Sequence, residues 1–276
     1  PDAATSSLSA SFTESDVLKC NKSFRKGSGA GPTDLLPQHY VDLTTGMKGE
    51  NGTKLVTALT NLFNNVILPG KVPSEMCPIF YGARLLALSK DDNGVRPIAI
   101  GNYLRRLASK CIAQKCSNKV GNMLKPNQLG VSMPSGCETA AHLARKIIDH
   151  PSSENKVMHK LDFRNAFNAV HRDHILKCIR EKLPEIFNFL WQCYSQETNL
   201  YFYDEVLKSS QGMQQGDGNS TYGFCLGIQH LIEQCTSLVK IFYLDDGTVI
   251  DYPEKVSSDL SFIINEGSKI GLSLNS

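Results

Sequence analysis

Hydrophobic positions with helical spacing recur along the whole chain. Thr13 and Asp16 have the spacing of a helix cap, which predicts a helix that runs to about residue 24. A second helix is predicted from residues that share one face: Leu55, Leu59, Leu62, Phe63 and Val66. The same spacing follows Asn102, at Leu104, Leu107, Ala108, Cys111 and Ile112. Further helices are predicted up to about residue 150, at 172–182, at 184–197 and around 256–264.

Strand-like segments lie between these predicted helices. Residues 79–88 and 95–100 flank a charged, glycine-containing turn, so they predict a hairpin. Later strands are predicted at 156–163, 199–203, 239–244 and 247–250. This mixed order favours an α+β fold, with a sheet that helices cover on one face. Residues 1–12 are small and polar, and we expect them to form a frayed, disordered N-terminal end.

The composition is that of a soluble globular protein. The chain has 276 residues, of which 41% are hydrophobic and 20% are charged, which is enough for one large domain or two ordinary ones. No apolar run approaches the length of a membrane span, and the N-terminus lacks the pattern of a signal peptide. We therefore expect an intracellular protein without membrane contact, in the nucleus or the cytoplasm. The nine cysteines occur singly, without a C-x-x-C pair, which favours reduced thiols over disulfides or structural zinc.

Charge is unevenly distributed although the formal net charge is only +2. Residues 101–125 contain no acid and carry six basic residues: Arg105, Arg106, Lys110, Lys115, Lys119 and Lys125. This density suits a phosphate backbone. A solvated helix face explains the same pattern, and on charge alone it is the more usual explanation.

Three acidic residues form the main candidate for chemistry. Asp245 and Asp246 lie between two predicted strands, at a tight hairpin turn. Asp-Asp-Gly is also ordinary turn sequence, so this pair alone is weak evidence. Asp162, however, lies at the end of the much earlier strand predicted at 156–163, beside Phe163, where a solvated surface acid is less expected. A neighbouring strand could bring it to the hairpin.

Carboxylates that converge at a sheet end repel one another, and divalent cations neutralise such clusters. We predict two Mg²⁺ ions, with Mn²⁺ as the alternative. Such a pair of ions activates a primer 3′-hydroxyl and stabilises an in-line phosphoryl displacement. The glycine-rich segment 212–218 could approach a nucleotide closely, and Lys90 and Arg96 could bind a triphosphate. A single glycine-rich loop is weak evidence, and Lys90 and Arg96 are equally compatible with a role as surface charges.

Taken together and in this order, the motifs resemble those of reverse transcriptases, and specifically of the non-LTR retrotransposon branch. Residues 85–90 and 94–98 resemble the fingers strands, and Gln128-Leu129-Gly130-Val131 resembles a segment typical of that branch. Three further stretches resemble motifs A, B and C: residues 160–167, 212–217 and 243–246.

The resemblance implies a right-hand polymerase with fingers at residues 13–155 and a palm at 156–276. The palm would be an antiparallel ferredoxin-like sheet backed by helices. Residues 271–276 resemble the start of motif D, so we expect a C-terminally truncated palm, a missing thumb and weak activity of this segment alone. The implied partners are an RNA template, a DNA primer and deoxynucleoside triphosphates, and the oligomeric state stays open.

The resemblance also assigns roles to single residues. Asp162 and Asp245 would be the main catalytic metal ligands, with Asp246 beside them and Phe163 in the metal site. Phe167 would be the aromatic gate against ribonucleotides. The nucleotide site would comprise Lys90, Arg96, Phe163, Phe167, Gln215, Gly216 and Tyr243, and the nucleic-acid contacts Arg105, Arg106 and Lys110.

Two other functions remain open from the sequence. An RNA-dependent RNA polymerase usually has Gly-Asp-Asp in motif C, and Phe167 argues against it. A non-catalytic RNA-binding relic has no need for three intact acids next to phosphates. His171 and His174 have the spacing of a metal pair but no evident third ligand, which favours a helix surface. The aromatic residues at 187, 189, 191 and 194 could stack on bases, but their helical spacing favours core.

Overall fold

The computed structural model describes residues 9–45, 50–89, 94–150 and 154–275. The chain divides into two compact units that interleave along the sequence. The first unit comprises Pro1–Lys115, Leu176–Ser210 and Gln214–Ser220, and the second comprises Cys116–Ile175, Gln211–Met213 and Thr221–Ser276. The fingers at 13–155 and the palm at 156–276 stay a prediction.

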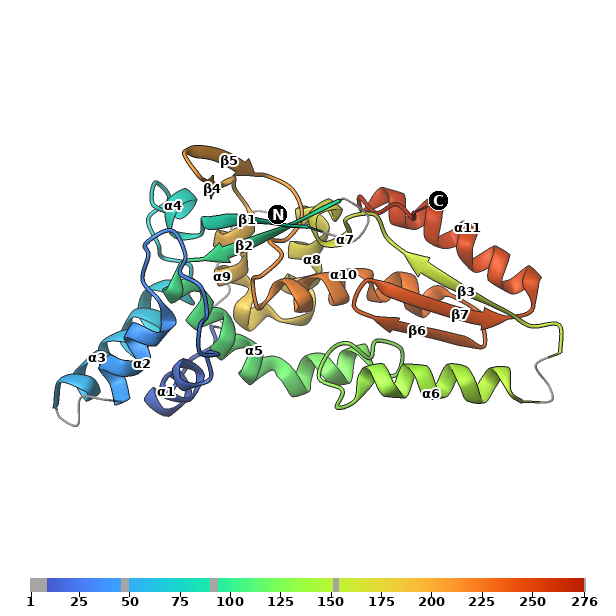
Figure 1. Ribbon diagram of the computed structural model, residues 1–276, viewed down its shortest axis with the longest axis horizontal. Helices are drawn as coiled ribbons and strands as arrows, with labels where there is room; N and C mark the ends of the chain where they lie inside the picture. The colour runs from blue at the N-terminus through green and yellow to red at the C-terminus, as the bar shows by residue number, and fades with distance from the viewer. Residues whose placement is uncertain (1–8, 46–49, 90–93, 151–153, 276) are drawn as a thin grey trace. The chain divides into compact units, whose positions relative to one another are not determined.

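The first unit is built on a four-stranded mixed sheet in the order β2-β1-β4-β5 (Figure 1). Strand β1 (Ala83–Ser89) pairs antiparallel with β2 (Val95–Gly101), which confirms the predicted hairpin strands, whereas its turn at 90–93 lies outside the described residues. On its other edge β1 pairs parallel with β4 (Thr198–Phe202). Strand β5 (Glu205–Ser209), which pairs antiparallel with β4, was not predicted.

The first unit also contains several helices, of which the first three along the chain pack on one another. Helix α1 (Glu14–Lys22) begins at the predicted cap, where Thr13 and Asp16 form a capping box. The second predicted helix is α3 (Glu50–Leu62), continued by a π-helical turn at Phe63–Ile67. The unit also contains α2 (Pro37–Thr45), α4 (Cys77–Phe80), α9 (Pro184–Tyr194) and the first part of α5 (Tyr103–Leu124). The short helices α2 and α4 were not predicted.

The core of the first unit corrects one expectation and supports another. Residues 9–12 belong to the segment expected to fray, yet Phe12 is only 4% exposed and packs edge-on against Phe63. Its backbone N–H donates to Asn64, which fixes this part of the N-terminal segment. Phe187, Phe189 and Tyr194 of α9 are buried, as expected of core aromatic residues.

The second unit contains a three-stranded antiparallel sheet in the order β3-β7-β6 (Figure 1). Its strands are β3 (Val157–Asp162), β6 (Val239–Tyr243) and β7 (Asp246–Asp251), close to the predicted ranges. Helix α6 (Gly136–Ile148) packs on β6, and α11 (Pro253–Lys269) packs on β7 and β3. Ala140, Ala144 and Ile147 of α6 cover the hydrophobic cluster of Leu129, Val239, Ile241 and Ile250.

Three further helices complete the fold: α7 (Ala166–Ala169), α8 (Arg172–Lys182) and α10 (Ser220–Gln234). The architecture is therefore the predicted α+β class, with an antiparallel sheet in the second unit and helices packed on it. Because β-strand residues alternate between faces, the α6-covered face carries the even-numbered residues of β3 and β7 and the odd-numbered residues of β6. This alternation positions the candidate acids.

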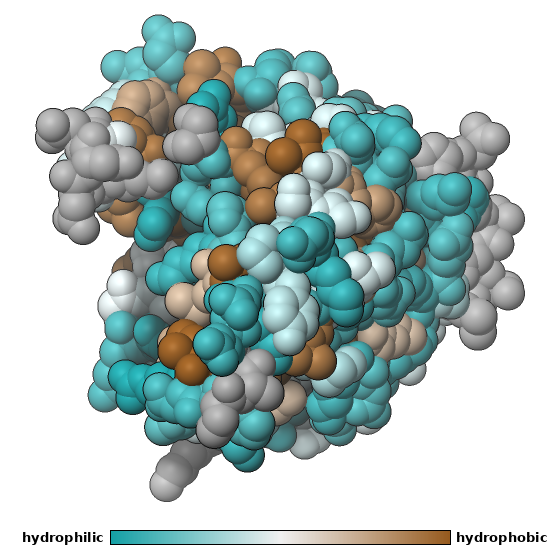
Figure 2. Space-filling view, turned by 90° about the vertical axis from the view of Figure 1, so that its right-hand side faces the viewer, coloured by the Kyte–Doolittle hydropathy of each residue, from teal (hydrophilic) through white to brown (hydrophobic). Residues whose placement is uncertain are grey.

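The surface is mixed in polarity. The face in Figure 2 is mainly hydrophilic, with hydrophobic side chains gathered in small patches between polar ones. Over the part of the chain that the structure describes, no helix has the length and apolar character needed to cross a membrane.

Candidate active site

Two predicted acids and one predicted tyrosine lie in a row across the second unit's sheet. Asp162 of β3 is the direct partner of Asp246 of β7, and Asp246 is in turn the partner of Tyr243 of β6. Directly paired residues point to the same face, with Cβ atoms about 5 Å apart. Both acids are exposed, and Tyr243 is 40% exposed. The row lies on the face that α6 covers farther along the strands.

Asp245 is held in a two-residue turn that connects β6 to β7. Leu244, the first turn residue, has a φ of 59°, in the left-handed region that bulky side chains disfavour. The side-chain amide of Gln128 binds this residue on both sides. Its Oε1 accepts from the Leu244 N–H at 2.7 Å, and its Nε2 donates to the Leu244 carbonyl at 3.0 Å.

The fit of these acids to divalent cations is partial. Asp162 and Asp246 are a like-charged, exposed pair, and neither makes an ion pair with any residue that the structure describes. Exposed carboxylate oxygens are the donors that Mg²⁺ prefers. The Asp162 carboxylate accepts a hydrogen bond from Asn275 Nδ2 at 2.8 Å, and the Asp162 carbonyl accepts one from the Asn275 N–H at 2.8 Å. Within the described ranges, however, no three Asp, Glu, His or Cys side chains converge as a metal-binding group.

The aromatic residues of the predicted motif A differ in accessibility. The Phe163 side chain is only 5% exposed, so a contact of this residue with a metal or a nucleotide would use its main chain. Phe167 is half-buried and stacks on Phe224, with ring centroids 4.5 Å apart. One face of the Phe167 ring is thereby covered.

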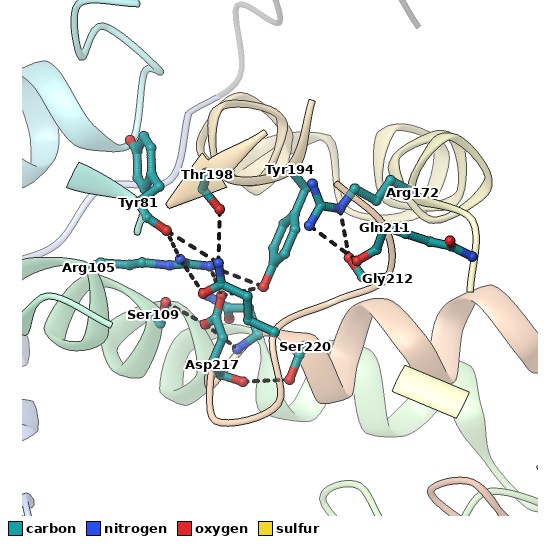
Figure 3. Close-up of polar contacts among 12 residues, drawn as sticks. Tyr81, Arg105, Ser109, Arg172, Tyr194, Thr198, Gln211, Gly212, Asp217 and Ser220 are labelled. Carbon is teal, nitrogen blue, oxygen red and sulfur yellow. Dashed lines mark hydrogen bonds and ion pairs between the residues drawn. The ribbon is translucent and has the colours of Figure 1, made fainter. Parts of the chain in front are cut away.

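The backbone of Phe167 is tied to the glycine-rich loop of the second unit. Its carbonyl accepts from the Met213 N–H at 2.7 Å. The adjacent Gly212 carbonyl accepts from Arg172 Nε at 2.8 Å, and the Gln211 carbonyl accepts from Arg172 Nη2 at 3.3 Å (Figure 3). A Cβ on Gly212 would lie 2.3 Å from the Asn168 backbone, so only glycine fits here.

Arg105 was predicted to contact nucleic acid, and its position in the first unit argues against that role. The side chain is 2% exposed and forms an ion pair with Asp217 at 2.7 Å. Figure 3 shows the guanidinium surrounded by the Tyr81 carbonyl, the Tyr194 hydroxyl and Asp217. It also donates to Gln214 Oε1 at 2.7 Å. Since both Nη atoms are buried and already bonded, Arg105 holds the 214–217 loop rather than a phosphate.

The other two predicted nucleic-acid contacts anchor an N-terminal loop of the first unit. Arg106 donates to the Gly29 carbonyl at 2.7 Å, and Lys110 donates to the Ser23 carbonyl at 3.0 Å. Both cations also lie over the Phe24 ring, within 5.3 Å and 5.0 Å of its centroid. Both remain partly exposed, so a phosphate contact would compete with these internal contacts.

The remaining predicted nucleotide contacts belong to the first unit. Arg96 of β2 is exposed, and Lys90 lies outside the described residues. The Gln215 carbonyl accepts from the Ala99 N–H of β2 at 2.8 Å, which fixes the half-buried Gln215 and the exposed Gly216 beside that strand. Arg96 therefore lies on β2, the strand to which the loop with Gln215 and Gly216 is hydrogen-bonded.

Sequence reasoning missed two residues beside the acids. Gln128 was recognised only as part of a family segment, and Asn275 only as part of a terminal stretch. No local pattern marks either, because each contact joins residues more than 100 positions apart: Gln128 with Leu244 and Asn275 with Asp162. For Gln128, the available signal was the Gln-x-Gly spacing at residues 128–130.

Comparison with known proteins gives one family and one fold. The family described as "Reverse transcriptase (RNA-dependent DNA polymerase)" matches residues 88–276, which is more than half of the chain. None of the curated protein sequences is a significant match.

Among solved structures, a telomerase from Candida albicans in complex with a TWJ fragment of telomeric RNA has a TM-score of 0.55 at 10% identity, over 74% of this chain and 42% of that one. Apo telomerase from Candida tropicalis has a TM-score of 0.52 at 11% identity, over 71% and 43%. This chain thus spans less than half of those telomerases, and at such identity the likeness concerns the fold alone.

Proposed function

This chain belongs to the reverse transcriptase (RNA-dependent DNA polymerase) family, and from that premise we propose that it is the polymerase segment of a retroelement enzyme. It would add deoxynucleotides to a DNA primer on an RNA template. The segment 128–131, similar to that of non-LTR retrotransposons, supports that branch. An RNA partner is also compatible with the fold, since one telomerase that shares it was solved with an RNA fragment.

The observation that carries this proposal is the row of Asp162, Asp246 and Tyr243 with Asp245 in the adjoining turn. Asp162 and Asp246 come from strands that are more than 80 residues apart in sequence. Formation of the β6–β7 turn can explain an acid in that turn, but it does not explain an acid on β3. Two exposed carboxylates on neighbouring strands repel each other. A divalent cation bound between the two carboxylates would offset this repulsion.

Asp162, Asp245 and Asp246 would hold two Mg²⁺ ions, or Mn²⁺ in their place, with the Phe163 main chain beside them. When bound, the ions supply Lewis-acid activation of the primer 3′-hydroxyl and charge neutralisation at the leaving pyrophosphate. The protein supplies the positions of the carboxylates. No side-chain nucleophile is required.

Each unit carries predicted nucleotide contacts of its own. Arg96 and Lys90 supply charge for a triphosphate, and Gln215 with Gly216 supplies a backbone surface fixed to β2. Phe167, held by Phe224 and by the Met213 contact, would exclude a ribose 2′-hydroxyl by steric overlap. Tyr243, exposed at the end of the acid row, would lie next to the primer terminus.

Primer extension on an RNA template tests the proposal. Asp245→Ala should abolish Mg²⁺-dependent synthesis, with a loss of at least about 1,000-fold, because the ions provide most of the transition-state stabilisation in phosphoryl transfer. Asp204→Ala is the matched control: Asp204 is an exposed acid in the two-residue turn between β4 and β5. Synthesis by the Asp245 variant at the wild-type rate would reject the assigned site.

One observation favours a second candidate, a non-catalytic RNA-binding domain. In the described part of the chain the acids do not converge as a group of three. RNA binding without any synthesis, unchanged by Mg²⁺ titration, would select this candidate. Supplying ribonucleotides in the same assay separates the proposed function from RNA-dependent RNA polymerase activity, for which they would be the preferred substrate.

A further inference from the structure

We propose that Gln128 is a positioning residue of the candidate active site, whose side-chain amide fixes the turn that carries Asp245 and thereby sets its affinity for divalent metal ions. The proposal deepens the proposed function and rests on it. Gln128 itself touches none of the three acids through a hydrogen bond in the described residues; it acts through the backbone of Leu244.

The contacts of Gln128 are complementary. The amide offers one acceptor and one donor, and the Leu244 backbone offers one donor and one acceptor, so the pair is joined by two hydrogen bonds. Oε1 also accepts from the Gly130 N–H at 3.1 Å. Gln128 is only 1% exposed, and a buried amide that loses its partners retains the full desolvation penalty. These bonds therefore resist displacement of the turn.

The segment around Gln128 is itself fixed to the sheet. The Phe242 N–H donates to the Asn127 carbonyl at 2.8 Å, and the Leu129 N–H donates to the Phe242 carbonyl at 2.7 Å. Phe242 belongs to β6, two residues before Leu244. The segment thus follows the edge of β6 for one bridge, and the Gln128 side chain continues to the turn where the backbone pairing ends.

Gly130 completes the contact. A Cβ at this position would lie 2.7 Å from Leu244 Cδ2 and 2.8 Å from the Leu244 backbone nitrogen. The side chain could rotate away, but the backbone nitrogen could not move without shifting the turn. Gln128 and Gly130 therefore hold Leu244 from two directions, one by hydrogen bonds and one by close packing.

The contacts of Gln128 and Gly130 with Leu244 are called the clasp. A second turn in the chain, which forms without such contacts among the described residues, indicates the role of the clasp. The β4–β5 hairpin also has a two-residue turn, Tyr203-Asp204, in which Tyr203 has a φ of 51° and is 91% exposed. This turn has the same residue pattern, a bulky residue before an aspartate, and it forms on the open surface. The Gln128 amide is thus not needed to make such a turn. It determines where the β6–β7 turn, and with it Asp245, is placed.

Amide hydrogen exchange tests the clasp independently of activity. In Gln128→Met, which keeps the side-chain length but removes both hydrogen-bonding atoms, exchange of the Leu244 N–H should accelerate by at least about tenfold, the factor that corresponds to losing about one hydrogen bond. Gln229→Met is the matched control. Gln229 is equally buried, on α10, and its amide donates to Glu233 rather than to the turn.

Direct Mn²⁺ binding, measured by electron paramagnetic resonance, tests the positioning role. Mn²⁺ affinity should fall by about tenfold in Gln128→Met and stay unchanged in Gln229→Met, although both variants lose a buried amide. Gln128→Glu adds a pH readout. A protonated glutamic acid reproduces the donor and acceptor of glutamine, so Leu244 protection and Mn²⁺ affinity relative to wild type should improve as the pH falls through the pKa of Glu at this position.

Each outcome tests one of three claims: the contacts of Gln128 with Leu244, the positioning role of Gln128, or the proposed metal site. Unchanged Leu244 exchange in Gln128→Met overturns the clasp, and accelerated exchange with unchanged Mn²⁺ affinity overturns the positioning role. Absence of Mn²⁺ binding to wild type, with Leu244 still protected, rejects the proposed metal site and the positioning role together while leaving the clasp intact. Asp245→Ala separates the effects, because it should lose Mn²⁺ but keep the Leu244 N–H protected.

Discussion

At the scale of single residues, Arg105 and Arg106 show that neighbouring charges can have unrelated roles. Both belong to an acid-free stretch whose charge density suits a phosphate backbone or a solvated helix face. The Arg105 side chain is buried and holds Asp217, whereas Arg106 is partly exposed and holds a loop carbonyl. Charge density along the sequence does not distinguish these cases, because helix periodicity alone does not reveal that Asp217 lies opposite Arg105.

The Arg105–Asp217 pair makes stability sensitive to pH. Burial raises the pKa of Asp217, but the Arg105 guanidinium, the Tyr194 hydroxyl and the Asn219 N–H outweigh burial, so the pKa lies below its usual value. A carboxyl with a depressed folded-state pKa stabilises the fold above its unfolded pKa of about 3.9, and this contribution is lost as the pH falls through the folded-state value.

We expect Arg105→Met to lower the free energy of unfolding at pH 7 by about 3–5 kcal/mol, because it leaves a buried, uncompensated carboxylate. The double variant with Asp217→Leu should lose less than the sum of the two single variants. Its stability should also depend less on pH below about pH 4. Urea denaturation from pH 7 to pH 3 measures both effects. Additive losses would contradict the pairing.

At the scale of elements, the strands of the second unit could be predicted because each has apolar residues bounded by turn residues. Strand β5 could not. It has five residues, of which only the adjacent Val206 and Leu207 are apolar, so its sequence has no alternating pattern. In the described part of the chain it pairs with β4 alone. Asp162, Asp246 and Tyr243 were named from motifs, but their direct pairing depends on a register that no local pattern specifies.

The loop at 211–213 gives a prediction at this scale. Gly212 has a φ of 63° and a Cβ there would meet the Asn168 backbone at 2.3 Å, so Gly212→Ala must displace the loop from the segment that carries Phe167. Gly27→Ala is the control, because Gly27 has a φ of 78° but nothing within 4 Å of a Cβ.

We expect Gly27→Ala to cost about 1 kcal/mol of unfolding free energy from backbone strain alone, and Gly212→Ala to cost at least about 2 kcal/mol more. Thermal and urea unfolding of the two variants measure the difference. Gly212→Ala should also weaken discrimination against ribonucleotides, since Phe167 loses its Met213 contact. Equal costs would show that the loop adapts without strain.

At the scale of the whole molecule, the interleaving of the two units determines which pieces can fold. The first unit takes Leu176–Ser210 from far along the chain. Gln192 in that segment accepts from the Tyr81 hydroxyl and bonds the Val72 backbone, and β4 pairs with β1. A fragment cut at the boundary that the sequence favoured, residues 1–155, lacks all of these partners.

We therefore expect residues 1–155 to unfold without a cooperative transition. Residues 1–115 joined by a long glycine–serine linker to 176–220 contain every segment of the first unit and should melt cooperatively. Circular dichroism melts compare the two. A cooperative melt of the shorter fragment would mean that the later segments are dispensable for this unit.

The cysteines have a practical consequence. Seven of the nine cysteines are buried, Cys178 is partly buried, and Cys137 is exposed at the start of α6. A maleimide dye or spin label should therefore react first at Cys137 under brief, native conditions, without removal of the other cysteines. Since α6 packs on β6, the strand that leads to Leu244, such a probe would report on the neighbourhood of the acids without altering any of them.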